Sequence, residues 1–257
     1  MAFDPLVFTS RPAYMQRIAD YVRSDHHRWT SGEVQLDRAH AFVQKFSVLY
    51  RIDATRGQRL RLKRCDIASA YLLMYARRAV DGSKLRTISW VLLISDGEHP
   101  AAVVEKLRDA HAPGERIRLD GYELVQLPRK DSAKPAWTWR MTAERYQTWR
   151  DRLVESARKP ALHAEHDITR RLYTVPGFAG IRSQVGFLVA LWRTEWKRRR
   201  AAGDAFPTLP RQLRYVQRLK STGVRVSQLT RDAAHAAESV PASAPAPHQQ
   251  AHQDDSK

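Results

Sequence analysis

Three groups of side chains have the types and spacing needed for chemistry at a metal ion or by a general base. Asp96, Glu98 and His99 stand where an apolar segment meets an expected helix, a frequent place for active-site groups. A carboxylate and an imidazole there can hold a divalent metal or act as a general base. The same residues also suit a turn at Asp96-Gly97 followed by a capped helix start, and this structural interpretation is favoured.

The other two groups are rich in histidine. The segment HAEHD at 163–167 lacks the i, i+4 spacing of the HExxH zinc helix, so a polar helix surface is the favoured interpretation. His26 and His27 are adjacent, and adjacent side chains on a helix diverge, which argues against a shared metal. No phosphate-binding loop, dinucleotide fingerprint, nucleophile elbow or kinase motif is present. The sequence therefore predicts no catalytic residue, no metal ligand and no cofactor.

Positive charge is concentrated in two segments, of which the larger is 193–231. It contains eleven Lys and Arg against only Glu195 and Asp204. The consecutive run 197–200 exceeds what a helix carboxyl terminus needs to balance its dipole. Its arginines further along recur at helical spacing, which is typical of a helix lying on a phosphate backbone, although a solvated basic face has the same pattern. The predicted phosphate contacts are Arg193, Lys197, Arg198, Arg199, Arg200, Arg211, Arg214, Arg218 and Lys220.

The second basic segment, TRGQRLRLKR at 55–64, alternates strictly over 58–63 and predicts an edge strand or an extended arm. Gly57 would let a loop approach a phosphate closely. Basic residues on an edge strand also deter aggregation, so binding and edge protection both remain open. The predicted contacts here are Arg56, Arg59, Arg61, Lys63 and Arg64.

Composition supports a partner of negative charge. The 257 residues include 44 Lys and Arg against 27 Asp and Glu, a formal net charge of +17, and 34 of the 44 cations are Arg. Arginine grips phosphate through a planar fork of donors, which favours nucleic acid, although a high Arg content can also reflect genome composition. The single cysteine excludes an intramolecular disulfide and a cysteine-based zinc site. With no secretory leader and no apolar run of about 20 residues, the sequence predicts a cytoplasmic protein with no membrane segment.

The elements that would position these residues follow from hydrophobic periodicity. Helices are expected after Ser10, over about 36–49, from Asp66 to about 80, and after Pro100 with Val103 and Val104 on its buried face. The apolar run 87–95 predicts a buried central strand, and 117–127 with 136–142 predict a hairpin. Trp137, Trp139, Tyr146 and Trp149 are expected in the core rather than as a platform for base stacking.

After residue 159 the pattern is helical, with a helix from Thr142 preceding it, a long helix at about 181–202 and a shorter one at 211–221. The segment 232–257 is poor in large apolar residues and predicts a disordered tail. We therefore expect an α+β domain at 1–158 with a small mixed or antiparallel sheet and packed helices, a basic helical region at 159–231, and the tail. The amino-terminal order also allows a ribbon–helix–helix module, which its long polar loop disfavours.

Together these patterns predict a non-enzymatic protein that binds nucleic acid, DNA in preference to RNA, mainly through phosphates. One alternative is a metal-dependent nuclease or strand-transfer enzyme that uses Asp96, Glu98 and His99. Another is an assembly or adaptor protein that binds an acidic partner. A protein partner or a homo-oligomer is compatible with each of these.

Overall fold

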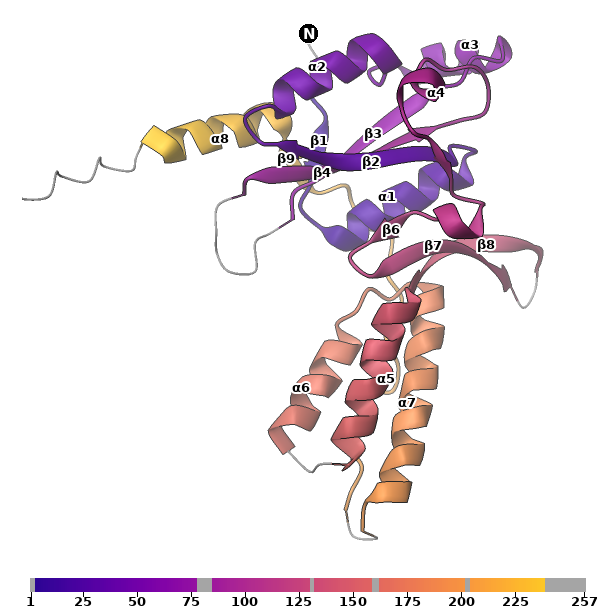
Figure 1. The fold of residues 1–257 in the computed structure, drawn as a ribbon, viewed down its shortest axis with the longest axis vertical. Coiled ribbons are helices and arrows are strands. Elements are labelled where there is room, and N and C mark those ends of the chain that lie inside the picture. The colour runs from indigo at the N-terminus through magenta and orange to yellow at the C-terminus, as the bar shows by residue number, and fades with distance from the viewer. Residues whose placement is uncertain (1–2, 78–84, 130–131, 159–161, 202–203, 239–257) are drawn as a thin grey trace, which may run out of the picture.

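The computed structural model describes residues 3–77, 85–129, 132–158, 162–201 and 204–238 (Figure 1). Its larger sheet has six strands in the order β5-β2-β4-β3-β1-β9. β1 and β3 are parallel, and the other neighbouring pairs are antiparallel. The strands are β1 (Leu6–Phe8), β2 (Arg28–Gln35), β3 (Ala70–Tyr75), β4 (Thr87–Ile94), β5 (Arg108–Asp109) and β9 (Gly223–Arg225).

A second, antiparallel sheet has the order β6-β7-β8. In Figure 1, α1 lies between the two sheets, α2 lies on the opposite face of the larger sheet, and α5, α6 and α7 form a bundle beyond the smaller sheet. The remaining strands are β6 (Arg118–Leu119), β7 (Tyr122–Arg129) and β8 (Ser132–Met141). The helices are α1 (Arg11–Arg23), α2 (Ala39–Tyr50), α3 (Arg56–Arg64), α4 (Ala101–Val104), α5 (Ala143–Arg158), α6 (Leu162–Tyr173), α7 (Ala179–Arg199) and α8 (Val226–Glu238).

The hydrophobic core has two parts, one on each face of the six-stranded sheet. Alternate residues of β4 separate them: Leu92 belongs to the part under α2, and Leu93 to the part under α1. The second part continues through Trp139 of β8 to Trp192 of α7. The fold is therefore α+β, as predicted, with a mixed sheet and packed helices. The expected domain boundary at 158 falls between α5 and α6, yet α5 packs on α7 across it.

Several elements match their sequence patterns. β4 is a buried central strand, and β7 and β8 form the expected hairpin. Trp139 and Trp149 are buried in the core, as expected. Thr142 precedes α5, and its hydroxyl accepts the Arg145 N–H at 3.3 Å. Ser10 precedes α1 without a side-chain capping bond. Because β2 separates α1 from α2, the arrangement is not a ribbon–helix–helix module.

Two neighbouring secondary-structure predictions are wrong: an expected strand is a helix, and an expected helix contains a strand. The alternating segment 58–63 lies in a helix, α3, because a capping box at Thr55 and Gln58 starts it and straight-chain residues fill it. The segment from Asp66, predicted as a helix, instead contains β3, whose side chains are buried on both faces of the sheet. The helix after Pro100 is also shorter than expected, and Val103 is 90% exposed.

The predicted helix at 211–221 is an extended segment. We call 204–222 the strap, because it runs from the end of α7 back along α1 to the larger sheet. Its main chain bonds to other elements: Val216 N–H to the Gly177 carbonyl at 3.1 Å, and Leu219 N–H to Gln16 Oε1 at 3.0 Å. These bonds replace the i→i−4 bonds of a helix. The tail predicted from 232 begins inside α8, and 239–257 lie outside the described residues.

Candidate functional site

The basic segment 55–64 forms one wall of a cavity of about 610 Å³. Five residues of α3 line it, and four of them, Arg56, Arg59, Leu60 and Lys63, have the spacing i, i+3, i+4, i+7. This spacing places them on one helix face. α3 contains five Lys and Arg and no acidic residue, and none of its residues is buried. A short, highly exposed helix thus presents a cationic stripe to a cavity.

The other walls come from the ends of α1, β3 and β4. Asp25 follows α1, Tyr71 is in β3, and Asp96 follows β4. The cavity therefore lies at one end of the central strands β3 and β4, between main-chain segments that are hydrogen bonded to one another. One of these bonds joins the Ala68 N–H to the Glu98 carbonyl at 3.0 Å.

Arg59 attaches α3 to the sheet. Its Nη2 donates to the Ile52 carbonyl at 2.8 Å and to the Ala70 carbonyl at 3.4 Å. Its guanidinium carbon lies 4.0 Å from the centre of the Tyr71 ring. These contacts occupy Nη2, and Nε is buried, so a bidentate fork around phosphate is not free and Arg59 positions the helix.

Aromatic residues next to Arg59 are already packed. Tyr21 stacks on Tyr71 with ring centres 4.0 Å apart, and Arg59 also lies over the Tyr71 ring. His26 contacts the edge of this stack, and its Nε2 lies 3.1 Å from Ser69 Oγ. Burial lowers the pKa of His26 below its usual value, which favours a neutral ring at pH 7. The Tyr71 ring is therefore occupied by these contacts rather than open to a base.

The other cations of α3 are accessible. Within the described residues, Arg56, Arg61 and Arg64 are exposed and make no ion pair. Lys63 Nζ lies 3.7 Å from Asp25, and both side chains are mostly exposed. An exposed pair of this kind contributes little to stability, so Lys63 is readily released to a ligand. Four cations of this helix thus remain able to contact phosphate.

In the carboxyl-terminal segment, the run 197–200 divides into different roles. Arg200 is 7% exposed and lies over the Trp196 ring, and it pairs with Glu165 at 2.8 Å. Its guanidinium also donates to the carbonyls of Ser156 and Ala157. Arg200 therefore holds the end of α7 against α5 and α6.

Other cations of this segment also contact neighbouring side chains. Arg198 and Arg199 both lie within 3.7 Å of Glu195, and Arg218 pairs with Asp20 at 2.6 Å. Arg193 lies 5.6 Å from the centre of the Phe206 ring. Among the predicted contacts of this segment, the exposed cations with neither an ion pair nor a ring contact to another described residue are Lys197, Arg211, Arg214 and Lys220.

α3 and the cations at the end of α7 lie at opposite ends of the molecule, whereas the strap runs from α7 back to the larger sheet (Figure 1). α3 is next to the larger sheet, whereas the end of α7 is at the far end of the helical bundle (Figure 1). The strap places Arg211, Arg214, Arg218 and Lys220 along an extended chain instead of on one helix face. The structure does not bring the predicted contacts together into one surface.

The structure also places the three candidate catalytic residues, Asp96, Glu98 and His99, in different surroundings. His99 is buried, and its Nδ1 accepts the Ala101 N–H at 3.2 Å, whereas Glu98 is exposed. Burial is the main reason that the pKa of His99 lies below its usual value. Asp96 does not cap α4, which has no side-chain capping bond, so that part of the favoured interpretation is wrong. Its Oδ1 lies instead 3.5 Å from His27 Nε2.

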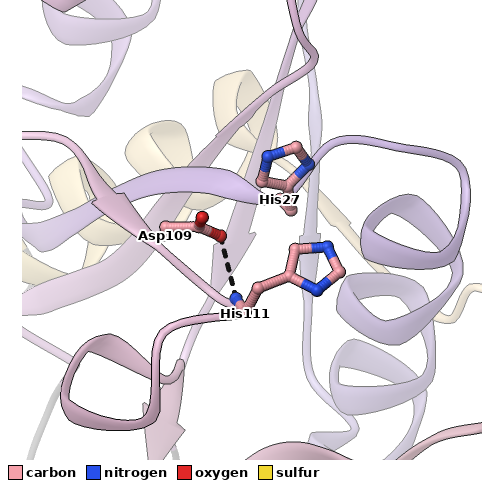
Figure 2. Close-up of side chains that lie close together, drawn as sticks. All are labelled: His27, Asp109 and His111. Atoms are coloured by element: carbon pink, nitrogen blue, oxygen red, sulfur yellow. Dashed lines mark hydrogen bonds between the residues drawn. The ribbon is translucent and has the colours of Figure 1, made fainter.

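Sequence reasoning missed a further cluster. His27, Asp109 and His111 lie close together, and the ligand atoms they offer are all within 4.8 Å of one another (Figure 2). His26 and His27 do diverge, since His26 faces Ser69. His27 nevertheless meets residues about 80 positions away because β5 pairs with β2. No local motif reports such a pairing.

Comparison with known proteins gives no relative: no family model, no curated protein and no solved structure matches the chain. Among the helices of the described residues, none is long and apolar enough to cross a membrane.

Proposed function

We propose that the protein binds nucleic acid, with DNA preferred over RNA, through phosphate contacts made by α3. The observation that carries this proposal is an exposed helix with five cations and no acidic residue, set beside a cavity of about 610 Å³. Helix surfaces of this kind provide phosphate contacts, which position a protein on a nucleic acid without reading its sequence. We propose a binding protein that does not act as an enzyme.

The occupied Tyr71 ring also favours phosphate over base recognition. Binding by phosphates alone releases condensed counterions and is steeply salt dependent. The exposed Cys65 is the only cysteine, which agrees with a reducing compartment, and we place the protein in the cytoplasm.

The test is a comparison of two charge variants with the wild type on random-sequence DNA. One combines Arg56→Gln, Arg61→Gln, Lys63→Gln and Arg64→Gln. The matched control removes the same charge elsewhere, through Lys197→Gln, Arg211→Gln, Arg214→Gln and Lys220→Gln. Arg59 and Arg200 are left intact because they hold elements together.

Fluorescence anisotropy between about 50 and 300 mM salt should show submicromolar binding by the wild type at the low end. The α3 variant should lose up to about 3.6 units of the log–log salt slope, at about 0.9 per contact on duplex DNA. The control variant should keep most of the slope. Micromolar or weaker binding to DNA and RNA at low salt would contradict the proposal, and equally tight binding to polyglutamate would favour an acidic protein partner.

A further inference from the structure

Two chain segments distant in sequence place three metal-ligand side chains together. His27 precedes β2, Asp109 ends β5, and His111 follows two residues later. The two imidazole rings are 4.8 Å apart between centres and meet edge to face. In Figure 2 the carboxylate and both rings border the same small space.

Main-chain bonds hold these residues in place. The Ala110 N–H donates to the His27 carbonyl at 2.9 Å, which continues the β2–β5 pairing. The Asp109 N–H donates to Glu115 Oε2 at 2.7 Å. The ring of His111 lies 5.0 Å from the Trp137 ring. The ligand positions therefore lie in or directly beside the paired strands β2 and β5, with His111 in the turn that follows β5.

The carboxylate of Asp109 retains the capacity to bind an ion. Its Oδ1 accepts the His111 N–H at 2.8 Å, which fixes its orientation. A carboxylate has about four acceptor sites on two oxygens, so one such bond leaves room for a metal. Tetrahedral ligands about 2.1 Å from an ion are about 3.4 Å apart. The three donors lie within 4.8 Å of one another, so each separation would have to shorten by at most about 1.4 Å to reach that spacing.

We propose that His27, Asp109 and His111 bind one divalent transition-metal ion of the zinc and cobalt class. Two imidazoles and one carboxylate suit these ions better than Mg²⁺ or Ca²⁺, which prefer all-oxygen shells. Three protein ligands leave a coordination position for water or a ligand. Asp96, 76% exposed and 3.5 Å from His27, adds negative charge beside the ion and also lines the cavity under α3.

None of the three ligands belongs to α3, so metal binding can be tested separately from the proposed nucleic-acid binding. Its test uses the full chain and Zn²⁺ or Co²⁺ alone. Calorimetric titration with Zn²⁺ should show one equivalent that is lost, or bound at least about tenfold more weakly, in the variants His111→Ala and Asp109→Asn. Co²⁺ should give visible absorption typical of a low coordination number in the wild type and lose it in these variants.

The matched control is His166→Ala, which removes an exposed histidine of α6. This variant should bind the ion as the wild type does. His111 is exposed, so its replacement leaves the fold intact, and circular dichroism checks that. Absence of Zn²⁺ binding by the wild type, or unchanged binding in both His111→Ala and Asp109→Asn, would overturn the proposal.

Discussion

Arg59 and Arg200 each place a guanidinium over an aromatic ring and donate to main-chain carbonyls of a neighbouring element. Such arginines connect elements, whereas Arg56 and Arg61 extend into solvent. The sequence shows all four as equivalent positive charges. Only the packing around each side chain distinguishes a structural cation from one able to contact phosphate, because that packing involves partners distant in sequence.

The buried side chain of His99 should make the stability of the protein depend on pH. Burial lowers the folded-state pKa of His99 and the charges of Arg28 and Arg51 lower it further, whereas a hydrogen bond from the ring to the Tyr50 main chain acts in the opposite direction. The unfolded state therefore binds a proton more readily than the folded state. The stability that neutral His99 contributes is complete above the unfolded-state pKa of about 6.5. It is lost as the pH falls through the lower folded-state pKa.

The variant His99→Asn keeps an acceptor for the Ala101 N–H and removes the titrating ring. Urea denaturation should show a smaller drop in the free energy of unfolding between about pH 7.5 and pH 5 for this variant than for the wild type. His166→Asn is the control, since that side chain is exposed on α6. An identical drop in the wild type and in His99→Asn would show that His99 is not the group responsible.

At the scale of elements, long periodic or apolar segments could be predicted, and short ones could not. The apolar run of β4 and the stripe of α7 have unambiguous patterns. In contrast, six alternating residues at 58–63 fit a strand and a helix, and the capping box at Thr55 and Gln58 was the overlooked signal. The AYLLMY segment of β3 equally fits a buried helix or a buried strand, and only its neighbours β1 and β4 decide.

The strap lies close against Gly177, and this contact should matter for stability. A Cβ at Gly177 would overlap the Arg214 carbonyl oxygen, whereas a Cβ at Gly186, on α7, would meet nothing within 4 Å. Gly177→Ala should therefore lower the free energy of unfolding by about 1–3 kcal/mol. Gly186→Ala should be neutral or stabilising by up to about 1 kcal/mol, because alanine favours a helix.

Denaturation in urea and limited proteolysis of the strap measure both effects. Gly177→Ala should increase cleavage at 204–222, and Gly186→Ala should not. If Gly177→Ala is as stable and as resistant as the wild type, the strap is not held against Gly177 in solution.

At the scale of the whole molecule, the sheet decides which distant residues meet. The sequence predicted basic regions and no metal ligands, because charge density is a local property and the approach of His27 to Asp109 is not. The sequence predicted one function for both basic regions, but α3 and the cations at the end of α7 lie at opposite ends of the molecule (Figure 1). We therefore centre the proposed nucleic-acid surface on α3, whose accessible cations lie on one short helix beside a cavity.

The most direct test of this claim is photo-crosslinking of a DNA duplex carrying a photoreactive base, followed by mass spectrometry of the peptides. Cleavage before aspartate releases α3 within the peptide 53–65, separate from 193–220. Our account predicts that crosslinks concentrate in 53–65 and in the other walls of the cavity, and that the α3 charge variant loses them. Crosslinks confined to 193–220, or unchanged in the α3 variant, would contradict it.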